Sequence, residues 1–429
     1  MKNLIYKKRK SQIVQHVLIL SLFLFSAMGY AFQQNTALEY NTYKGEVINE
    51  QSGRPISSAH LALNNSNIST ITNADGEFSL KVPQDLTEAT VTISFLGFKS
   101  KTLPLTYFKA RNTRISLSES VEQLSEVNIF KADDPKEVVR EMLAKKDQNY
   151  LSDQSLMTSF YRETIKKGWN NVSLSEAVVK IQKNPYNSDK KDLVSLYKAR
   201  KSTDYNKLDT VALKLRGGPF NTLYLDLMKY TEYVLQPTML DQYEFEFDSP
   251  TKINDKYIFV INFEGLDQTS PWYYGKLFVD AASLTLVKAE YSLNVDDRNE
   301  AAKMFVKKKP RGAKVYPVEM NYKVDYAENN GKWHYSYGQA ELEYVVNWKK
   351  KIFNSRYKIN SEMVVTNWEK FASNDREWRR SSDLINPSIV MVDDVAGFYD
   401  TEFWGSNNII EPEKSIQNAI DKIKRRIEQ

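Results

Sequence analysis

The 429-residue sequence contains no cysteine and only three histidines. Without cysteine, the chain can form neither a disulfide nor a thiolate metal site, and it offers no thiol for lipid attachment. Beyond the first 31 residues only His60 and His334 remain, and neither stands in the His-x-x-Glu pair that a zinc peptidase of the carboxypeptidase type needs. We therefore expect no bound metal.

Motifs of nucleophilic and cofactor chemistry are also missing. The sequence has no Gly-x-Ser-x-Gly elbow, no phosphate-binding loop and no dinucleotide fingerprint. We expect no cofactor, and hydrolysis by a Ser-His-Asp triad is disfavoured because so few histidines exist. Hydrolysis of a glycoside by a pair of carboxylates remains an alternative. The adjacent pairs are Asp296-Asp297 and Asp393-Asp394, although such pairs are more typical of turns and loop edges.

Long apolar runs are absent except near the start of the chain. Five basic residues between Lys2 and Lys10 precede an apolar run at residues 17 to 25, and small residues follow at Gly29 and Ala31. This run is shorter than the roughly 20 residues that a membrane-spanning helix needs. Residues 1 to 31 are therefore predicted to be a signal peptide, which places the mature protein in the periplasm or at the outer membrane without a transmembrane span.

Excess charge is also lacking once that leader is set aside. The net charge is +5, and all five units lie in residues 1 to 31, so 54 residues of each sign remain. This balance argues against a nucleic-acid partner. The lysine-rich runs at 307 to 309, 349 to 351 and 422 to 426 are each more typical of a solvated face or loop than of a binding patch.

Short alternating runs broken by turn signals are abundant near the start of the mature chain. The chain is too long for one hydrophobic core, which favours two domains. Residues 42 to 118 alternate in the strand period, with turn signals at Ser52-Gly53-Arg54-Pro55 and Asp75-Gly76. So many short strands bury enough area only if two sheets pack face to face.

Four motifs in this region carry a family resemblance. They are Gly45-x-Val47, Ser52-Gly53-x-Pro55-Ile56-x-x-Ala59, Thr72-Asn73-x-Asp75-Gly76-x-Phe78 and Ile93-Ser94-Phe95-Leu96-Gly97-Phe98. In this order they resemble the carboxypeptidase-regulatory-like domain of Bacteroidota envelope proteins. The resemblance implies a transthyretin-like or prealbumin-like β-sandwich, which despite its name carries no peptidase centre.

A polar segment at 119 to 135 is predicted to be a linker, and a helix should begin after Asp134, with Pro135 in its first turn. The region 136 to 404 then reads as a second, larger antiparallel domain with long strands, including hairpins at 275 to 293 and 315 to 346. We expect a curved sheet or an incomplete barrel. An apolar concavity in such a barrel would be similar to lipoprotein and lipid carriers in architecture alone.

Segments 160 to 163, 174 to 179 and 403 to 413 also resemble larger Bacteroidota proteins that carry this sandwich. With these segments the resemblance spans most of the mature chain. In the final part, 405 to 429, apolar residues recur at helical spacing from Ile416 to Ile427 and predict an amphipathic helix. We expect it to dock on its own sheet, with a partner or membrane surface as the alternative.

Aromatic residues cluster at 272 to 274, 333 to 337 and 399 to 404. Rings of this kind stack on sugars or line apolar grooves, and the alternative is that each cluster divides between core and sheet surface. The proposed ligand contacts are Trp272, Tyr274, Trp333, Tyr399 and Trp404. The sequence predicts an exported, non-enzymatic module that binds a lipid, a glycan or an outer-membrane protein. The alternatives are a carboxylate-dependent hydrolase and a purely structural envelope component.

Overall fold

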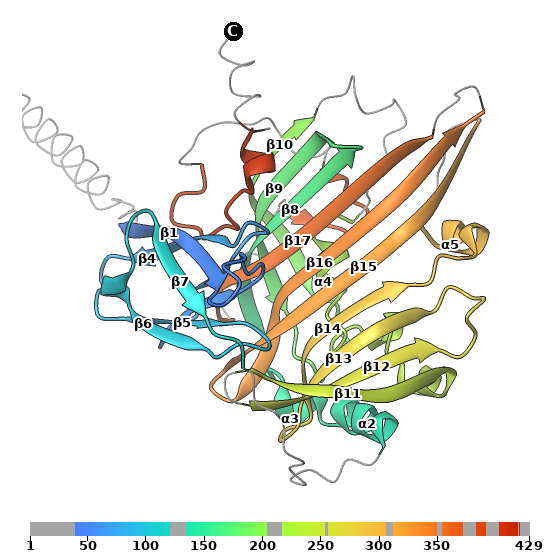
Figure 1. Ribbon diagram of the computed structural model, residues 1–429, viewed down its shortest axis with the longest axis horizontal. Helices are drawn as coiled ribbons and strands as arrows, with labels where there is room; N and C mark the ends of the chain where they lie inside the picture. Colours follow the sequence, from blue (N-terminus) through green and yellow to red (C-terminus); the bar gives the residue numbers. More distant parts are fainter. Residues whose placement is uncertain are drawn as a thin grey trace, which may run out of the picture. The chain divides into compact units, whose positions relative to one another are not determined.

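The computed structural model (Figure 1) describes residues 39–120, 134–203, 217–253, 256–305, 312–349, 354–371, 383–391, 403–418 and 420. Residues 41–429 form one compact unit. The predicted signal peptide, most of the predicted linker, Tyr399 and the Asp393-Asp394 pair lie outside the described residues.

Two small sheets come first. One contains β1 (Tyr40–Asn49), β4 (Glu77–Pro83) and β7 (Thr113–Leu117) in the order β4-β1-β7, and β1 and β7 are parallel. The other contains β2 (His60–Leu63), β3 (Ser69–Ile71), β5 (Thr90–Ser94) and β6 (Lys101–Pro104) in the order β3-β2-β5-β6, and a 3-10 turn, η1 (Leu105–Tyr107), follows β6. Val47 and Phe78 from the first sheet share one buried core with Leu61 and Ile93 from the second. The prediction that the chain is mainly β and begins with small sheets is confirmed.

The turn before β4 depends on a glycine. Gly76 has a φ of +74°, and a Cβ at this position would lie 2.7 Å from the carbonyl oxygen of Val47. Only glycine meets both conditions without strain. The Asp-Gly turn signal in the sequence therefore marks a close approach of two strands.

The second body is one large sheet, drawn from green through yellow to orange in Figure 1. Its strands are β8 (Ser155–Lys167), β9 (Asn170–Lys183), β10 (Leu193–Thr203), β11 (Tyr243–Ile253), β12 (Lys256–Gly265), β13 (Tyr273–Asp280), β14 (Thr285–Leu293), β15 (Ala313–Asn329), β16 (Lys332–Trp348), β17 (Ser355–Lys370) and β18 (Leu384–Ile385). The order is β11-β12-β13-β14-β15-β16-β17-β8-β9-β10-β18, and all neighbours are antiparallel. Because no pairing joins β11 to β18 among the described residues, the sheet is unclosed, as predicted.

Within the described ranges, and apart from a helical turn at 414–418, the helices are few and short. They are α2 (Pro135–Ala144), α3 (Lys146–Asn149), α4 (Phe220–Leu223) and α5 (Arg298–Phe305), with the 3-10 turns η2 (Thr231–Tyr233) and η3 (Pro237–Gln242). The Asp134 side chain accepts a hydrogen bond from Lys136 N at 2.8 Å, so it caps α2 as its position in the sequence predicts. Among the described residues, no helix has the length and apolar character that a bilayer crossing requires.

Strands β8 and β9 are buried on both faces. On the inner face, Tyr161 belongs to a core with Val139 of α2 and Leu223 of α4. On the outer face, Phe160 and Val178 pack against Trp404. Strands covered on both sides read as continuous buried runs instead of an alternation, which is the pattern that β8 and β9 show.

The outer cover is an irregular segment, residues 403–413, which we call the strap. It lies between the large sheet and the small sheets. Arg162 Nη2 of β8 donates to Ile410 O at 2.8 Å, and Thr70 Oγ1 of β3 donates to Ile409 O at 3.2 Å. The Asn408 side chain pairs with the backbone of Lys81 twice, accepting from its N at 2.6 Å and donating to its O at 3.0 Å. The strap therefore joins the two bodies through its backbone carbonyls and through the Asn408 side chain.

Beyond the strap, residues 414–418 are helical. Ile416 and Ile420 pack against Leu174 of β9, which is the contact expected for docking on the chain's own sheet. Residues 405–413 of the predicted C-terminal segment belong to the irregular strap and not to a helix, and residues 419 and 421–429 lie outside the described residues.

Candidate functional site

Two of the five aromatic residues proposed as ligand contacts, Trp272 and Tyr274, line one pocket in the large sheet. Trp333 and Trp404 are only 6% and 3% exposed and belong to the core. Tyr399 lies outside the described residues. The structure therefore brings Trp272 and Tyr274 together, and it places Trp333 and Trp404 elsewhere.

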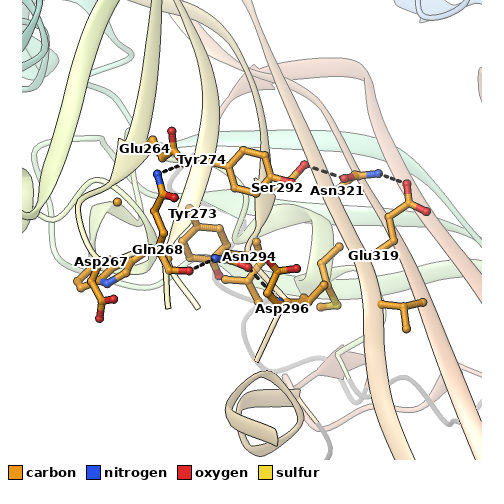
Figure 2. Close-up of a pocket in the computed structure, with 16 residues that line it drawn as sticks. Glu264, Asp267, Gln268, Tyr273, Tyr274, Ser292, Asn294, Asp296, Glu319 and Asn321 are labelled. Atoms are coloured by element: carbon orange, nitrogen blue, oxygen red, sulfur yellow. Dashed lines mark hydrogen bonds between the residues drawn. The ribbon is translucent and has the colours of Figure 1, made fainter. Parts of the chain in front are cut away.

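We call this cavity the rim pocket. It measures about 370 Å³ and forms where the β12–β13 loop meets the end of β14 and the first half of β15. Figure 2 shows its polar side chains converging from these separate segments. The polar lining residues are Glu264, Asp267, Gln268, Ser292, Asn294, Asp296, Glu319 and Asn321.

Asp267 shapes the β12–β13 loop. Its Oδ1 accepts from Thr269 N at 2.9 Å and from Thr269 Oγ1 at 2.6 Å, and its Oδ2 accepts from Ser270 Oγ at 2.5 Å. The hydrogen bonds from Ser270 and Thr269 lower the pKa of Asp267 to about 2. This carboxylate stays ionised near neutral pH, so it is unsuited to donate a proton.

The ring of Trp272 folds back over the end of β12. A Cβ at Gly265 would lie 2.4 Å from the Cβ of Trp272, so glycine is needed for this approach. The ring also meets Tyr243 edge to face, with centroids 5.4 Å apart. One side of Trp272 is thus fixed by packing while the residue still lines the cavity, and the neighbouring Tyr274 is 45% exposed.

Hydrogen bonds hold the other walls. Asn321 Nδ2 donates to Glu319 Oε1 at 2.7 Å, and Ser292 Oγ donates to Asn321 Oδ1 at 2.7 Å. Across the pocket, Gln268 Nε2 donates to Glu264 Oε1 at 3.1 Å. Figure 2 shows both chains of contacts. The polar groups are therefore held in place before any ligand arrives, which lowers the entropic cost of binding.

The charge of the rim pocket is of one sign. Four carboxylates line it, and among the described residues no lysine, arginine or histidine does. Carboxylate and amide oxygens accept hydrogen bonds from hydroxyl groups, and they repel phosphate and sulfate. The arrangement can bind a neutral or cationic polar molecule, and it disfavours an anionic one.

The described carboxylates considered for hydrolysis, Asp296 and Asp297, make different contacts. Asp296 lines the rim pocket, whereas Asp297 caps α5 by accepting from Asn299 N at 2.9 Å. Burial raises the pKa of Glu163 to about 7, although a hydrogen bond from Tyr161 opposes the shift. Glu163 is the type of group that a general acid requires, but it does not line the rim pocket.

Both remaining histidines line another cavity, of about 560 Å³, where residues 60–69 meet β16 and β17. Burial lowers the pKa of His60 to about 4 and that of His334 to about 3. His334 also packs against Trp368, with ring centroids 5.2 Å apart. Within the described part of the chain, no three metal-ligating side chains are grouped so that they could hold an ion.

A third cluster is buried on the inner face of the large sheet. Lys183 Nζ lies 2.7 Å from Asp192 Oδ2 and 2.7 Å from Asp226 Oδ2. Tyr230 donates to Asp192 at 2.8 Å, and Tyr326 donates to Asp226 at 3.0 Å. Each charge has a partner, so we interpret the cluster as a structural link between β9 and the 217–242 segment.

Sequence reasoning missed the polar half of the rim pocket. Glu264, Asn294 and Asn321 stand on different elements, and none belongs to a motif. The one local signal is Asp267 followed by Thr269 and Ser270, a pattern typical of side-chain turns. It predicts a shaped loop but not the walls that face it.

Comparison with known protein families gives a match for the part of the chain that contains the small sheets. Residues 43–129 match the model of the CarboxypepD_reg-like domain family. This range agrees with the region that carries the sequence motifs. A search of curated proteins found no match for the chain.

Several solved structures have a distant likeness to this chain, and three of them are bacterial proteins with the following values. A domain of an outer membrane lipoprotein-sorting protein from Vibrio parahaemolyticus is 11% identical, with a TM-score of 0.26, covering 57% of this chain and 97% of its own. A LolA superfamily protein from Nitrosomonas europaea is 10% identical, with a TM-score of 0.21, covering 55% and 96%. The MucA/MucB complex of Pseudomonas aeruginosa gives 10% identity and a TM-score of 0.18, covering 56% and 100%.

Proposed function

We propose that this chain is an exported, non-enzymatic binding module of the bacterial envelope, and that its rim pocket takes a segment of a neutral glycan. One observation carries the proposal. Trp272 and Tyr274 stand beside fixed hydrogen-bond acceptors in a cavity whose described lining residues include no cation. The pattern of residues 1 to 31 supports export.

A sugar ring has an apolar face of C–H groups and an edge of hydroxyl donors. The face packs on an aromatic ring, and the hydroxyls donate to carboxylate or amide oxygens. The rim pocket supplies both kinds of partner within about 370 Å³, a size suited to a short segment of a chain. A lipid would need an apolar cavity instead. On the inner face, side chains from α2 and the 217–242 segment belong to the buried core of the large sheet.

The test is calorimetric titration of the chain without residues 1–31 against neutral oligosaccharides of glucose, mannose and N-acetylglucosamine. We expect binding to one of them, and Tyr274→Ala should weaken it about tenfold, because a stacked ring contributes on the order of 1 kcal/mol or more. Tyr107→Ala is the matched control, since Tyr107 is also 45% exposed but lies in the small sheets. It should leave the affinity unchanged.

Other outcomes would contradict the proposal. Spermidine is the cationic probe, and binding of spermidine without any oligosaccharide would show that the carboxylates select a cation. If Tyr274→Ala and Tyr107→Ala weakened the affinity equally, the oligosaccharide would not bind in the rim pocket. Release of new reducing ends from a bound oligosaccharide would show a hydrolase, the alternative class.

A further inference from the structure

The ends of four neighbouring strands meet at one end of the large sheet. Lys167 of β8 is opposite Tyr357 of β17, Val346 of β16 is opposite Ser355 of β17, and Ala313 of β15 is opposite Trp348 of β16. In Figure 1 these strand ends lie along the upper part of the sheet. We call residues 166–171, 312–316, 346–349 and 354–358 the basic end.

Charge is the first feature of the basic end. Its cations are Lys166, Lys167, Lys314, Lys349, Arg356 and Lys358, and these four ranges contain no aspartate or glutamate. Deeper in β16, Glu343 binds Arg356 at 2.6 Å and Lys358 at 3.1 Å. Lys166 and Lys358 also line a cavity with Glu319, Glu341 and Glu413, so carboxylates deeper in the sheet offset part of the positive charge. Lys314 and Lys349 are exposed at the strand ends and keep an excess of positive charge there. The chain as a whole is balanced beyond residue 31, so this concentration is local.

The second feature is an aromatic side chain with no cover. Trp169, at the tip of the β8–β9 turn, is 101% exposed, and no other large apolar side chain in the described residues exceeds 61%. The preceding Gly168 has a φ of +57°, and the space around its Cα is open. The turn therefore presents the indole to solvent instead of folding it onto the sheet.

We propose that the basic end docks on an anionic lipid surface, with Trp169 entering the headgroup layer. Indole rings favour that layer because they have an apolar body and a polar N–H. Lysine and arginine lie along the surface with their stems on apolar groups and their charges at the phosphates. A nucleic acid would satisfy the cations but would not require a protruding indole.

This docking goes beyond glycan binding because it uses none of the residues that line the rim pocket. It also differs from the insertion of a transmembrane segment, since the contact is made by the ends of four strands and one indole ring. The attraction should weaken with salt, as expected for exposed charges facing a charged surface.

The test is co-sedimentation of the chain without residues 1–31 with vesicles of phosphatidylcholine, with and without phosphatidylglycerol. We expect binding only when phosphatidylglycerol is present, with a loss at high salt and a blue shift of tryptophan fluorescence. Trp169→Ala should abolish the shift and weaken partitioning about tenfold. The variant Lys166→Gln/Lys167→Gln/Lys349→Gln should weaken it by about a hundredfold.

The control is Lys99→Gln/Lys109→Gln/Arg111→Gln, which removes the same charge from exposed positions of the small sheets. It should bind as the unmodified chain does. Equal weakening by both triple variants would overturn the proposal, because whole-molecule charge would then explain the binding. Binding to a DNA oligonucleotide without binding to vesicles, or an unchanged blue shift in Trp169→Ala, would overturn it too. Circular dichroism of each variant checks that the sheet is intact.

Discussion

Lys183 shows how one buried charge can hold distant parts of the chain together. Its side chain and those of Asp192 and Asp226 are essentially inaccessible to solvent. Burial alone lowers the pKa of a lysine, but the attraction of Asp192 and Asp226 outweighs it and raises the pKa of Lys183. The ammonium group therefore remains charged inside the protein.

We expect Lys183→Met to lower the free energy of unfolding by about 3–5 kcal/mol, because two carboxylates would be left facing each other without a cation. Urea unfolding at neutral pH measures this loss. Lys180→Met on the same strand is the control: Lys180 is only partly buried, and its described hydrogen-bond partner is the Thr158 hydroxyl. A similar loss in both variants would contradict the assignment.

No local pattern in the sequence marks this cluster. Lys183, Asp192 and Asp226 are three ordinary charges in a chain that is 26% charged. Asn321 and Glu264 in the rim pocket could not be predicted from a local pattern either, because only the order of the strands brings them to the same cavity. By contrast, the Asp134 cap and the Gly76 turn were predictable because each has a hydrogen bond within a few residues, from Lys136 N to Asp134 and from Gly76 N to Asn73 O.

At the scale of the elements, the packing of the strap on the large sheet depends on the side chain of Trp404. Trp404 meets Phe160 edge to face at 5.3 Å, and the guanidinium of Arg200 lies 4.8 Å from its ring centroid. The Arg200 side chain also donates to Glu176 Oε2 at 2.7 Å. The aromatic ring thus covers a buried ionic pair on the outer face.

Trp404→Ala should destabilise the protein by about 3–5 kcal/mol through the cavity it leaves. Trp169→Ala provides a matched control, since the same atoms are removed from a fully exposed position and should change stability by at most about 0.5 kcal/mol. Thermal or urea unfolding distinguishes the two. Comparable stability in both variants would mean that the strap does not depend on this ring.

Hairpins were the most predictable elements. The turns between β13 and β14 and between β15 and β16 fall at the positions that the sequence indicates. Segments 160 to 163 and 174 to 179 carried a resemblance but no structural prediction, and in the sheet they pair directly, with Arg162 opposite Glu176. Their run of buried residues hides the alternation that strand prediction uses, because both faces are covered.

At the scale of the whole molecule, acid should weaken the junction at His60 and His334. In the unfolded chain both imidazoles titrate near 6.5, whereas burial lowers their folded pKa values to about 4 and about 3. The unfolded state therefore binds protons first as the pH falls. The stabilising contribution is complete above pH 6.5 and is lost progressively toward pH 3.

We expect the free energy of unfolding to fall by about 3 kcal/mol between pH 6.5 and 4 from His334 alone. Urea unfolding across this range provides the measurement. His334→Gln should flatten the profile, and a profile unchanged by this substitution would assign the acid sensitivity to other groups, such as the carboxylates around Lys183.

The order of the large sheet could not be derived from the sequence. Its central pairing joins β8 to β17, about 200 residues apart, so Arg162 meets Glu362. Local patterns give the number and length of strands but not the partner of a strand so distant. The mainly β class, the small sheets ahead of a large one and the unclosed sheet were predictable, whereas the polar residues that line the rim pocket were not.

The strap sets a time order for assembly. Trp404 and Ile410 emerge from the ribosome more than 200 residues after β8, yet they fill the seam between that strand and β3. Until they arrive, Phe160, Val178 and Ile71 have an unfilled apolar seam between them. A chain truncated before residue 403 would keep that apolar seam exposed and would be bound by chaperones or degraded by proteases. The outer face can therefore be completed only after residues 403–413 have been synthesised.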